Sequence, residues 1–197
     1  MMLVEETGVP TAAWPVAAFR DHLRLGTGFA DEAVQDAVLE RLLRAASGAV
    51  ERRTGKVLLE RSFLWTLNAW RGYAKEELPV GPVTSITELR ILSADGVVSV
   101  ISPVAYGLEP DTHRPVLAAR SLGLPTVPVG GLAEIAFDAG FAADWSGVPD
   151  DLAQAVFLLA AHYHENRHET AGGATMPHGV EALIAPWRPM RLFGRRR

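Results

Sequence analysis

The stretch VPDDLAQAVFLLAAHYHENRHETAGGATMPHGVEALIAPWRPMR, residues 148–191, carries the most information about this chain. Pro149 and the acidic pair Asp150 and Asp151 are typical of a helix N-terminus, where carboxylates offset the exposed amide dipoles. Apolar side chains then recur at helical spacing, which predicts a helix to about His168. After this helix come a loop that contains two glycines, a short predicted helix over 180–185 and an arginine-rich end.

Two further helices are predicted before this stretch. Pro15 favours a helix from Val16 to about Leu25, and Asp31 is a suitable N-cap for a longer helix that ends near Arg53, before Gly55. In the longer helix, one stripe of apolar residues has the i, i+4, i+7 spacing of a single helix face, and we expect this face to be buried. Its members are Val34, Val38, Leu42, Ala45, Ala46 and Ala49.

The middle of the chain changes from helical to strand periodicity. In residues 59–69 apolar and polar side chains alternate, which is the pattern of a half-buried strand. Asp95-Gly96 is a strong hairpin signal, and prolines and glycines divide residues 103–131 into short segments. Five more strands are expected, at residues 78–80, 85–92, 97–101, 106–109 and 132–138. The fold class is therefore α+β, a small α-helical bundle with an inserted antiparallel β lobe.

Composition limits the possible functions. The 197 residues suffice for one domain with a proper core, and the net charge of −4 argues against a general nucleic-acid binder. The chain contains no cysteine, so disulfides, thiolate zinc sites and cysteine nucleophiles are excluded. We see no signal peptide and no membrane span, and we expect synthesis in the cytoplasm.

His164-Glu165-Asn166-Arg167-His168 spells the H-E-x-x-H pattern of zinc peptidases. In such a site two imidazoles on one helical face bind zinc, while the glutamate activates the metal-bound water. A catalytic site needs a third protein ligand, and the extension found in one peptidase class fails at Ala171 and Ala174. Only His178 or Glu181 could be the third zinc ligand, and only if the loop that contains Gly172 and Gly173 folds back. We therefore keep a zinc-dependent peptidase that uses His164, Glu165 and His168 as the alternative, and expect a protein without enzymatic activity, metal or cofactor.

Several segments, in order, resemble the head–tail connector (head-completion adaptor) family of tailed phages and gene transfer agents. They are AAFRDHLRL, AVERRTGKVLLERSF, ELPVGPVTSITELRILSADG, AEIAFDAGFAADWSGVPDDLAQAVFLLAAHYHENRHE and PHGVEALIAPWR. The resemblance runs nearly end to end. It implies N-terminal bundle helices in residues 1–56, a β lobe in 57–147, C-terminal bundle helices in 148–185 and an extended tail in 186–197.

The resemblance also implies a location and partners. Such proteins form a homo-oligomeric ring, commonly of twelve subunits, on the portal protein at the capsid vertex of the virion. They extend the DNA channel and carry the stopper or tail-completion protein, and non-specific contact with DNA in the channel is possible. The C-terminal segment is expected to reach into the portal.

The composition of that tail suits a docking role. Aromatic and arginine residues dominate interface hot spots, and five arginines with no acid lie in the last ten residues. We read Trp187 as an interface anchor because it lies outside any predicted core. The predicted portal-binding residues are Pro186, Trp187, Arg188, Arg191, Leu192, Phe193, Arg195, Arg196 and Arg197.

Overall fold

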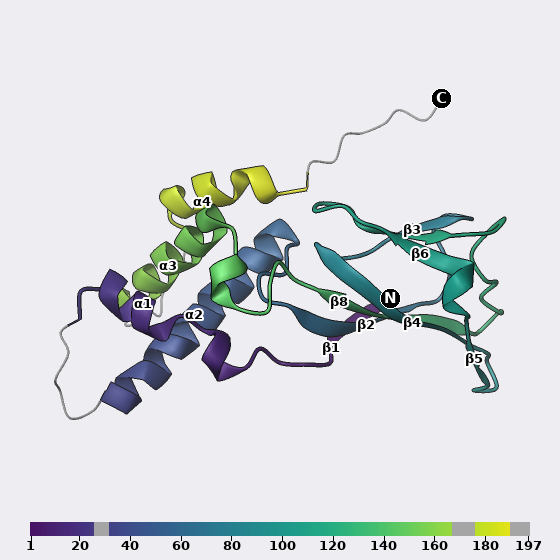
Figure 1. The fold of residues 1–197 in the computed structure, drawn as a ribbon, viewed down its shortest axis with the longest axis horizontal. Coiled ribbons are helices and arrows are strands. Elements are labelled where there is room, and N and C mark those ends of the chain that lie inside the picture. Colours follow the sequence, from purple (N-terminus) through teal and green to yellow (C-terminus); the bar gives the residue numbers. More distant parts are fainter. Residues whose placement is uncertain (26–31, 167–175, 190–197) are drawn as a thin grey trace. The chain divides into compact units, whose positions relative to one another are not determined.

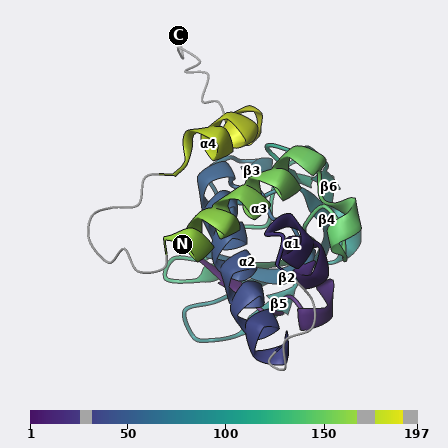
Figure 2. The same cartoon turned by 90° about the vertical axis from the view of Figure 1, so that its left-hand side faces the viewer.

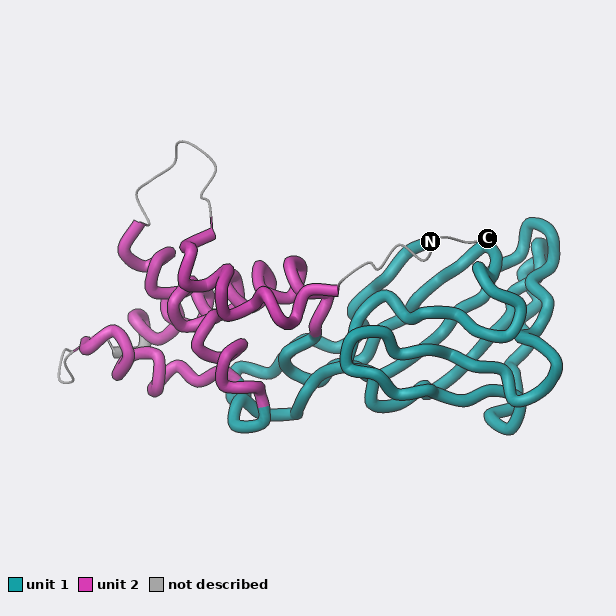
Figure 3. Tube along the Cα trace, turned by 90° about the horizontal axis from the view of Figure 1, so that it is seen from above, with its two compact units in different colours: residues 1–13, 57–147 teal, residues 14–56, 148–197 magenta. Residues whose placement is uncertain are grey.

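A computed structural model describes residues 1–25, 32–166 and 176–189 of the chain (Figure 1). These residues form four α-helices and two antiparallel sheets, which confirms the α+β class. The chain divides into two compact units (Figure 3). Unit 1 contains residues 1–13 and 57–147, and unit 2 contains residues 14–56 and 148–197. No described helix has the length and apolar character needed to cross a membrane.

The larger sheet of unit 1 has the order β1-β2-β8-β4-β5, and all neighbouring strands are antiparallel. The bounds are β1 (Met2–Glu5), β2 (Arg61–Leu67), β8 (Leu132–Ala139), β4 (Val83–Leu92) and β5 (Val98–Val100). The alternation predicted for β2 is confirmed, because Phe63, Trp65 and Leu67 are buried while the residues between them are half-buried. The predicted hairpin turn is also present between β4 and β5. There Gly96 has a φ of +81°, a conformation that glycine adopts without strain.

A second sheet has the order β3-β7-β6 and lies face to face with the first (Figure 1). Its strands are β3 (Lys75–Glu77), β7 (Val116–Ala119) and β6 (Tyr106–Glu109). The strand predicted at residues 78–80 is wrong, because the paired residues are the three before it. Pro79 has no N–H to donate, and Leu78 makes only a single bond outside the ladder, to the carbonyl of Pro115 (2.9 Å).

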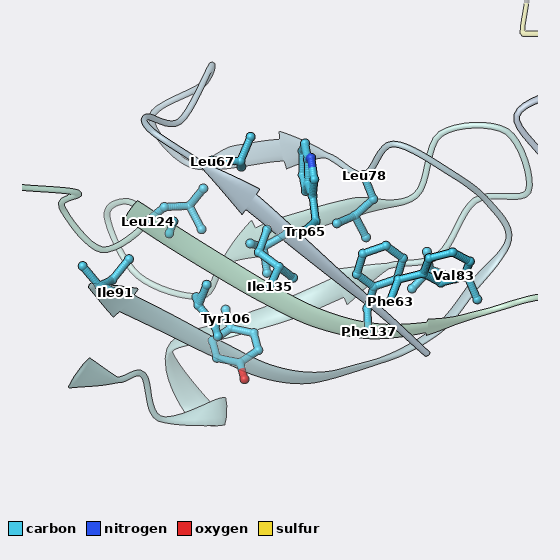
Figure 4. Packing of buried hydrophobic residues seen from close by; sticks show 14 of the residues in the cluster. Phe63, Trp65, Leu67, Leu78, Val83, Ile91, Tyr106, Leu124, Ile135 and Phe137 are labelled. Atoms are coloured by element: carbon cyan, nitrogen blue, oxygen red, sulfur yellow. The ribbon is translucent and has the colours of Figure 1, made fainter. Parts of the chain in front are cut away.

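The core of unit 1 fills the space between these sheets (Figure 4). Trp65 of β2 and Phe137 of β8 are fully buried, and so is Leu117 of β7. The rings of Phe63 and Phe137 stack with centroids 5.6 Å apart. Burial of each such side chain stabilises the fold by about 1.5–3 kcal/mol, so this cluster is the main source of stability for the lobe.

Residues 1–13 depart from the expected division of the chain. The sequence assigned them to the helical bundle, but β1 pairs along β2, with Leu3 opposite Trp65. All four residues of β1 are exposed, so the strand buries no side chain that would produce a recognisable apolar pattern. Backbone pairing at the sheet edge therefore places this segment in unit 1.

Unit 2 consists of α1 (Val16–His22), α2 (Glu32–Thr54), α3 (Asp150–Glu165) and α4 (His178–Ile184). A short 3₁₀ turn, η4 (Ala185–Trp187), follows α4. The other 3₁₀ turns belong to unit 1 and are η1 (Thr11–Ala13), η2 (Pro103–Ala105) and η3 (Trp145–Gly147). Helix α2 packs against α1 and α3, and α4 packs against α3 (Figure 2). Gly55, with a φ of +68°, ends α2 as expected. The proposed N-cap Asp31 lies outside the described residues.

The buried face of α2 is not the predicted one. Leu39, Leu43 and Val50 are fully buried, whereas Val34 and Val38 are 66% and 40% exposed. Ala46 is the one member of the predicted stripe that is buried, since it lies where the two faces meet. The sequence contains two adjacent apolar stripes on this helix, and spacing alone could not decide which of them faces α1 and α3.

Candidate functional site

The first turn of α3 contacts the beginning of the predicted docking tail. Pro149 precedes the helix, and Asp150 and Asp151 occupy its first turn, as predicted. The indole Nε1 of Trp187 donates a hydrogen bond of 2.6 Å to Oδ2 of Asp151. This bond ties the end of η4 to the beginning of α3 and fixes the point from which the tail departs.

Helix α4, which leads directly into η4, also holds the base of the predicted tail in place. Val180 and Ile184 are buried, and together with α3 they close the apolar interior of unit 2. Arg53 of α2 forms an ion pair with Glu181 of α4, with 3.2 Å between Nη2 and Oε1. The base of the tail is therefore attached to two helices by apolar burial and by polar contacts.

The predicted tail begins later than the sequence suggested. Pro186 and Trp187 belong to the 3₁₀ turn η4, and the backbone becomes extended only at Arg188 (φ −73°, ψ 134°). Trp187 is half-buried and bonded within its own chain, so its indole N–H is not a free interface donor. Arg188 is exposed. The remaining predicted residues, Arg191, Leu192, Phe193, Arg195, Arg196 and Arg197, lie outside the described residues.

The structure describes only the first three residues of the zinc-peptidase pattern, His164 to Asn166. His164 and Glu165 occupy the last turn of α3, but the helix ends at Glu165 rather than near His168, and His168 lies outside the described residues. Asn166 follows the helix, and its side-chain amide lies 2.9 Å from Nδ1 of His162. The pattern requires two imidazoles one helical turn apart on the same helix, and α3 supplies only the first of them.

The two residues considered as a third zinc ligand do not complete the site. His178 is exposed at the first residue of α4, and the Glu181 carboxylate is engaged by Arg53. Within the described part of the chain, no three histidine, aspartate or glutamate side chains are grouped closely enough to hold a metal ion. The geometry of these residues gives the peptidase alternative no support.

A cavity of about 530 Å³ lies within unit 2 among α2, α3 and α4. Its lining combines the cations Arg52 and Arg53 with His162, Tyr163 and Glu181. Sequence reasoning missed this cavity because its residues come from three separate helices. The H-E-x-x-H pattern at residues 164–168 contains none of these side chains.

No family model matches the chain, and no curated protein does. Three chains from solved structures, however, match it over nearly the whole of both chains. A chain in the neck of an empty GTA particle computed with C6 symmetry is 52% identical with a TM-score of 0.90, and both chains are covered completely. A chain in the virion of a native gene transfer agent (GTA) particle is 52% identical with a TM-score of 0.87 and 98% coverage of both.

The third chain is found in the neck of a native GTA particle computed with C12 symmetry. It is 48% identical with a TM-score of 0.84, and the match covers both chains completely. This chain belongs to the neck-protein family of gene transfer agent particles. The neck protein is thus a structural component of a particle, in agreement with the predicted connector family. The matches cover 98–100% of both chains, so both units have counterparts in those chains.

Proposed function

We propose that this neck protein is a virion adaptor that forms a ring on the portal, extends the DNA channel and joins the head to the stopper or tail. The observation that carries the proposal is full-length similarity, at 48–52% identity, to chains in GTA necks computed with C6 and C12 symmetry. Both symmetries are compatible with twelve copies around one axis, because a twelvefold ring also has sixfold symmetry.

The C-terminal segment is the proposed portal contact. Trp187 and Asp151 fix its base on unit 2, and the backbone is extended at Arg188. Arginine forms bidentate bonds with carboxylates and phosphates, which suits both a protein groove and passing DNA. Ring formation repeats each contact around the axis, so modest affinities per subunit produce lasting attachment.

Removal of residues 190–197 tests this proposal. The cut leaves η4 and the Trp187–Asp151 bond intact, so we expect a folded protein with unchanged thermal stability that no longer attaches to portal-containing heads. Attachment is measured by co-sedimentation of the protein with tailless heads. A second variant that replaces the five terminal-segment arginines with lysine keeps the charge and removes the bidentate geometry, and we expect it to bind more weakly than the intact chain.

Normal attachment of the truncated protein would contradict the assignment of the tail as the portal contact. A loss of folding would contradict the view that the segment lies outside the structural core. The peptidase alternative is tested separately by metal analysis of the purified protein and by Glu165→Gln. Stoichiometric zinc and a peptidase activity that this substitution abolishes would replace the proposed function.

A further inference from the structure

Helix α2 carries a second apolar face that nothing in the described structure covers. Val34, Val38, Leu42 and Ala45 lie along one side of the helix, and we name them the outer stripe. Val34 is 66% exposed and Val38 is 40% exposed, Ala45 is exposed, and Leu42 is half-buried. A helix that is apolar on two sides is typical of a helix with a partner on each side.

Helix α1 lies on the opposite flank of α2 from the outer stripe. Arg20 of α1 forms an ion pair with Asp36, and the guanidinium of Arg44 lies 5.1 Å from the centroid of the Trp14 ring. At about 100° per residue, Asp36 and Arg44 both point away from the outer stripe. Figure 2 shows α1 on one side of α2. The outward surface of α1 and the outer stripe therefore face opposite directions within unit 2.

The outward surface of α1 suits a close helix contact. Phe19 points inward and is fully buried, so Ala17 and Asp21, two residues to either side, point outward, and both are exposed. A small residue such as alanine lets two helices approach to the shorter end of the usual 8–10 Å interaxial range. Valine side chains of a partner helix would fill the space above it.

The two surfaces carry opposite charges. Arg41 is exposed beside the outer stripe, one turn from Val38, and forms no ion pair with any residue that the structure describes. Asp21 is exposed on α1 and likewise has no side-chain partner in the described ranges. Since these residues lie on opposite flanks, they cannot pair within one chain, but they can pair between neighbouring chains.

We propose that the outer stripe of α2 in one copy packs against the outward surface of α1 in the next copy, with an ion pair between Arg41 and Asp21 of the two copies. A closed ring requires such a contact between two different surfaces on opposite sides of the subunit. The outer stripe and α1 meet that requirement in position, shape and charge. This inference rests on the proposed ring function and names the lateral interface within it.

Paired cysteines test the contact in assembled necks. The chain has no native cysteine, so Ala17→Cys and Val38→Cys in one chain introduce the only two thiols. Within a chain the two positions face opposite ways and cannot be bridged. In particles that carry the double variant, a short bismaleimide should produce a ladder of covalent oligomers beyond the dimer on a denaturing gel. Each single variant should remain monomeric, because neither position meets its own copy.

A charge exchange tests the same contact without cross-linking. Arg41→Asp and Asp21→Arg should each lower the number of copies in purified necks by at least about tenfold, because like charges would then face each other. The double variant should restore near-normal occupancy. Arg120→Asp serves as a charge-matched control and should have little effect, since Arg120 is an exposed arginine of unit 1 that belongs to neither surface.

Two results would overturn the proposal. Necks that contain the double-cysteine variant in normal amounts but give no ladder would show that the surfaces do not meet. Dimers from Val38→Cys alone would show that the outer stripe packs against itself. Absence of even the unsubstituted protein from necks would instead refute the proposed function, so the two failures are distinguishable.

Discussion

Asp150 and Asp151 are adjacent carboxylates in the same helical turn, but their contacts differ. Both lie where the amide dipoles of α3 favour negative charge. Asp151 alone also accepts the indole N–H of Trp187. Asp151 also accepts the backbone N–H of Leu152 at 2.9 Å. The two positions therefore share the helix dipole and differ in their hydrogen bonds.

We expect Asp151→Asn to lower the free energy of unfolding by about 1–2 kcal/mol more than Asp150→Asn, because hydrogen bonds to charged groups contribute about 1.5–3 kcal/mol. Urea denaturation followed by tryptophan fluorescence measures both variants. Trp187→Phe, which deletes the same N–H, should reproduce most of the difference. Equal effects of the two asparagine substitutions would mean that the Trp187 bond adds nothing to stability.

Tyr106 of β6 provides a pH-dependent probe of unit 1. Burial raises the pKa of its hydroxyl above the ordinary value of 10.0, and the nearby Glu88 carboxylate also raises it, while a backbone hydrogen bond at Leu89 acts in the opposite direction. The folded state therefore favours the protonated hydroxyl. The resulting stabilisation is complete below about pH 10 and is lost as the pH rises through the pKa of the folded state.

We expect the stability of the intact protein to fall more steeply above pH 10 than that of Tyr106→Phe. The phenylalanine variant has no hydroxyl to ionise but keeps the buried ring. Thermal unfolding across pH 8–11 measures the two slopes, with Tyr73→Phe as a control, since Tyr73 is 77% exposed. Parallel slopes for Tyr106→Phe and the intact protein would exclude this titration as a source of alkaline instability.

At the scale of elements, the sequence predicted most helices and strands because their periodicity reflects burial. Helices α1 to α4, strands β2, β4, β5, β6 and β8 and the turn at Gly96 were all expected close to their observed positions. Strands β1 and β7 were not expected. Strand β1 buries nothing, and only one of the four residues of β7 is buried, so neither has an alternating pattern to detect.

A pair of substitutions, one on each apolar face of α2, tests which face is buried. Leu43→Ala should cost about 2–5 kcal/mol of stability in the isolated protein, because it leaves a cavity in a fully buried position. Val38→Ala should change stability by less than about 0.5 kcal/mol, as is usual for exposed positions. Chemical denaturation measures both. A larger effect at Val38 would restore the stripe that the sequence first indicated.

The proposed docking segment, residues 186–197, shows where prediction from sequence ends. Its arginine and aromatic composition was visible, and the start of α3 was predicted by its proline and aspartates. The hydrogen bond between Trp187 and Asp151 joins residues 36 positions apart, and no local pattern connects them. The cavity of unit 2 was invisible for the same reason, since its lining depends on how three helices pack.

At the scale of the whole molecule, the proposed ring contact is a small surface. The outer stripe and the outward surface of α1 involve a few side chains each, whereas a stable isolated interface involves roughly 20–30 residues on each side. We therefore expect the purified neck protein to be monomeric or weakly associated in dilute solution, with the portal serving as a template for the ring. Light scattering at micromolar concentration measures this. A stable oligomer in the absence of portal would contradict templated assembly.

The chain passes between unit 1 and unit 2 at residues 13–14, 56–57 and 147–148. Unit 1 is therefore built from two separate segments of the chain, and recombination could not exchange it as one continuous block. A graft of residues 57–147 onto a related bundle would arrive without β1, exposing the backbone edge of β2 that β1 covers. Related necks that trade their lobes must therefore trade their N-terminal residues as well, which links variation at the start of the gene to variation in its middle.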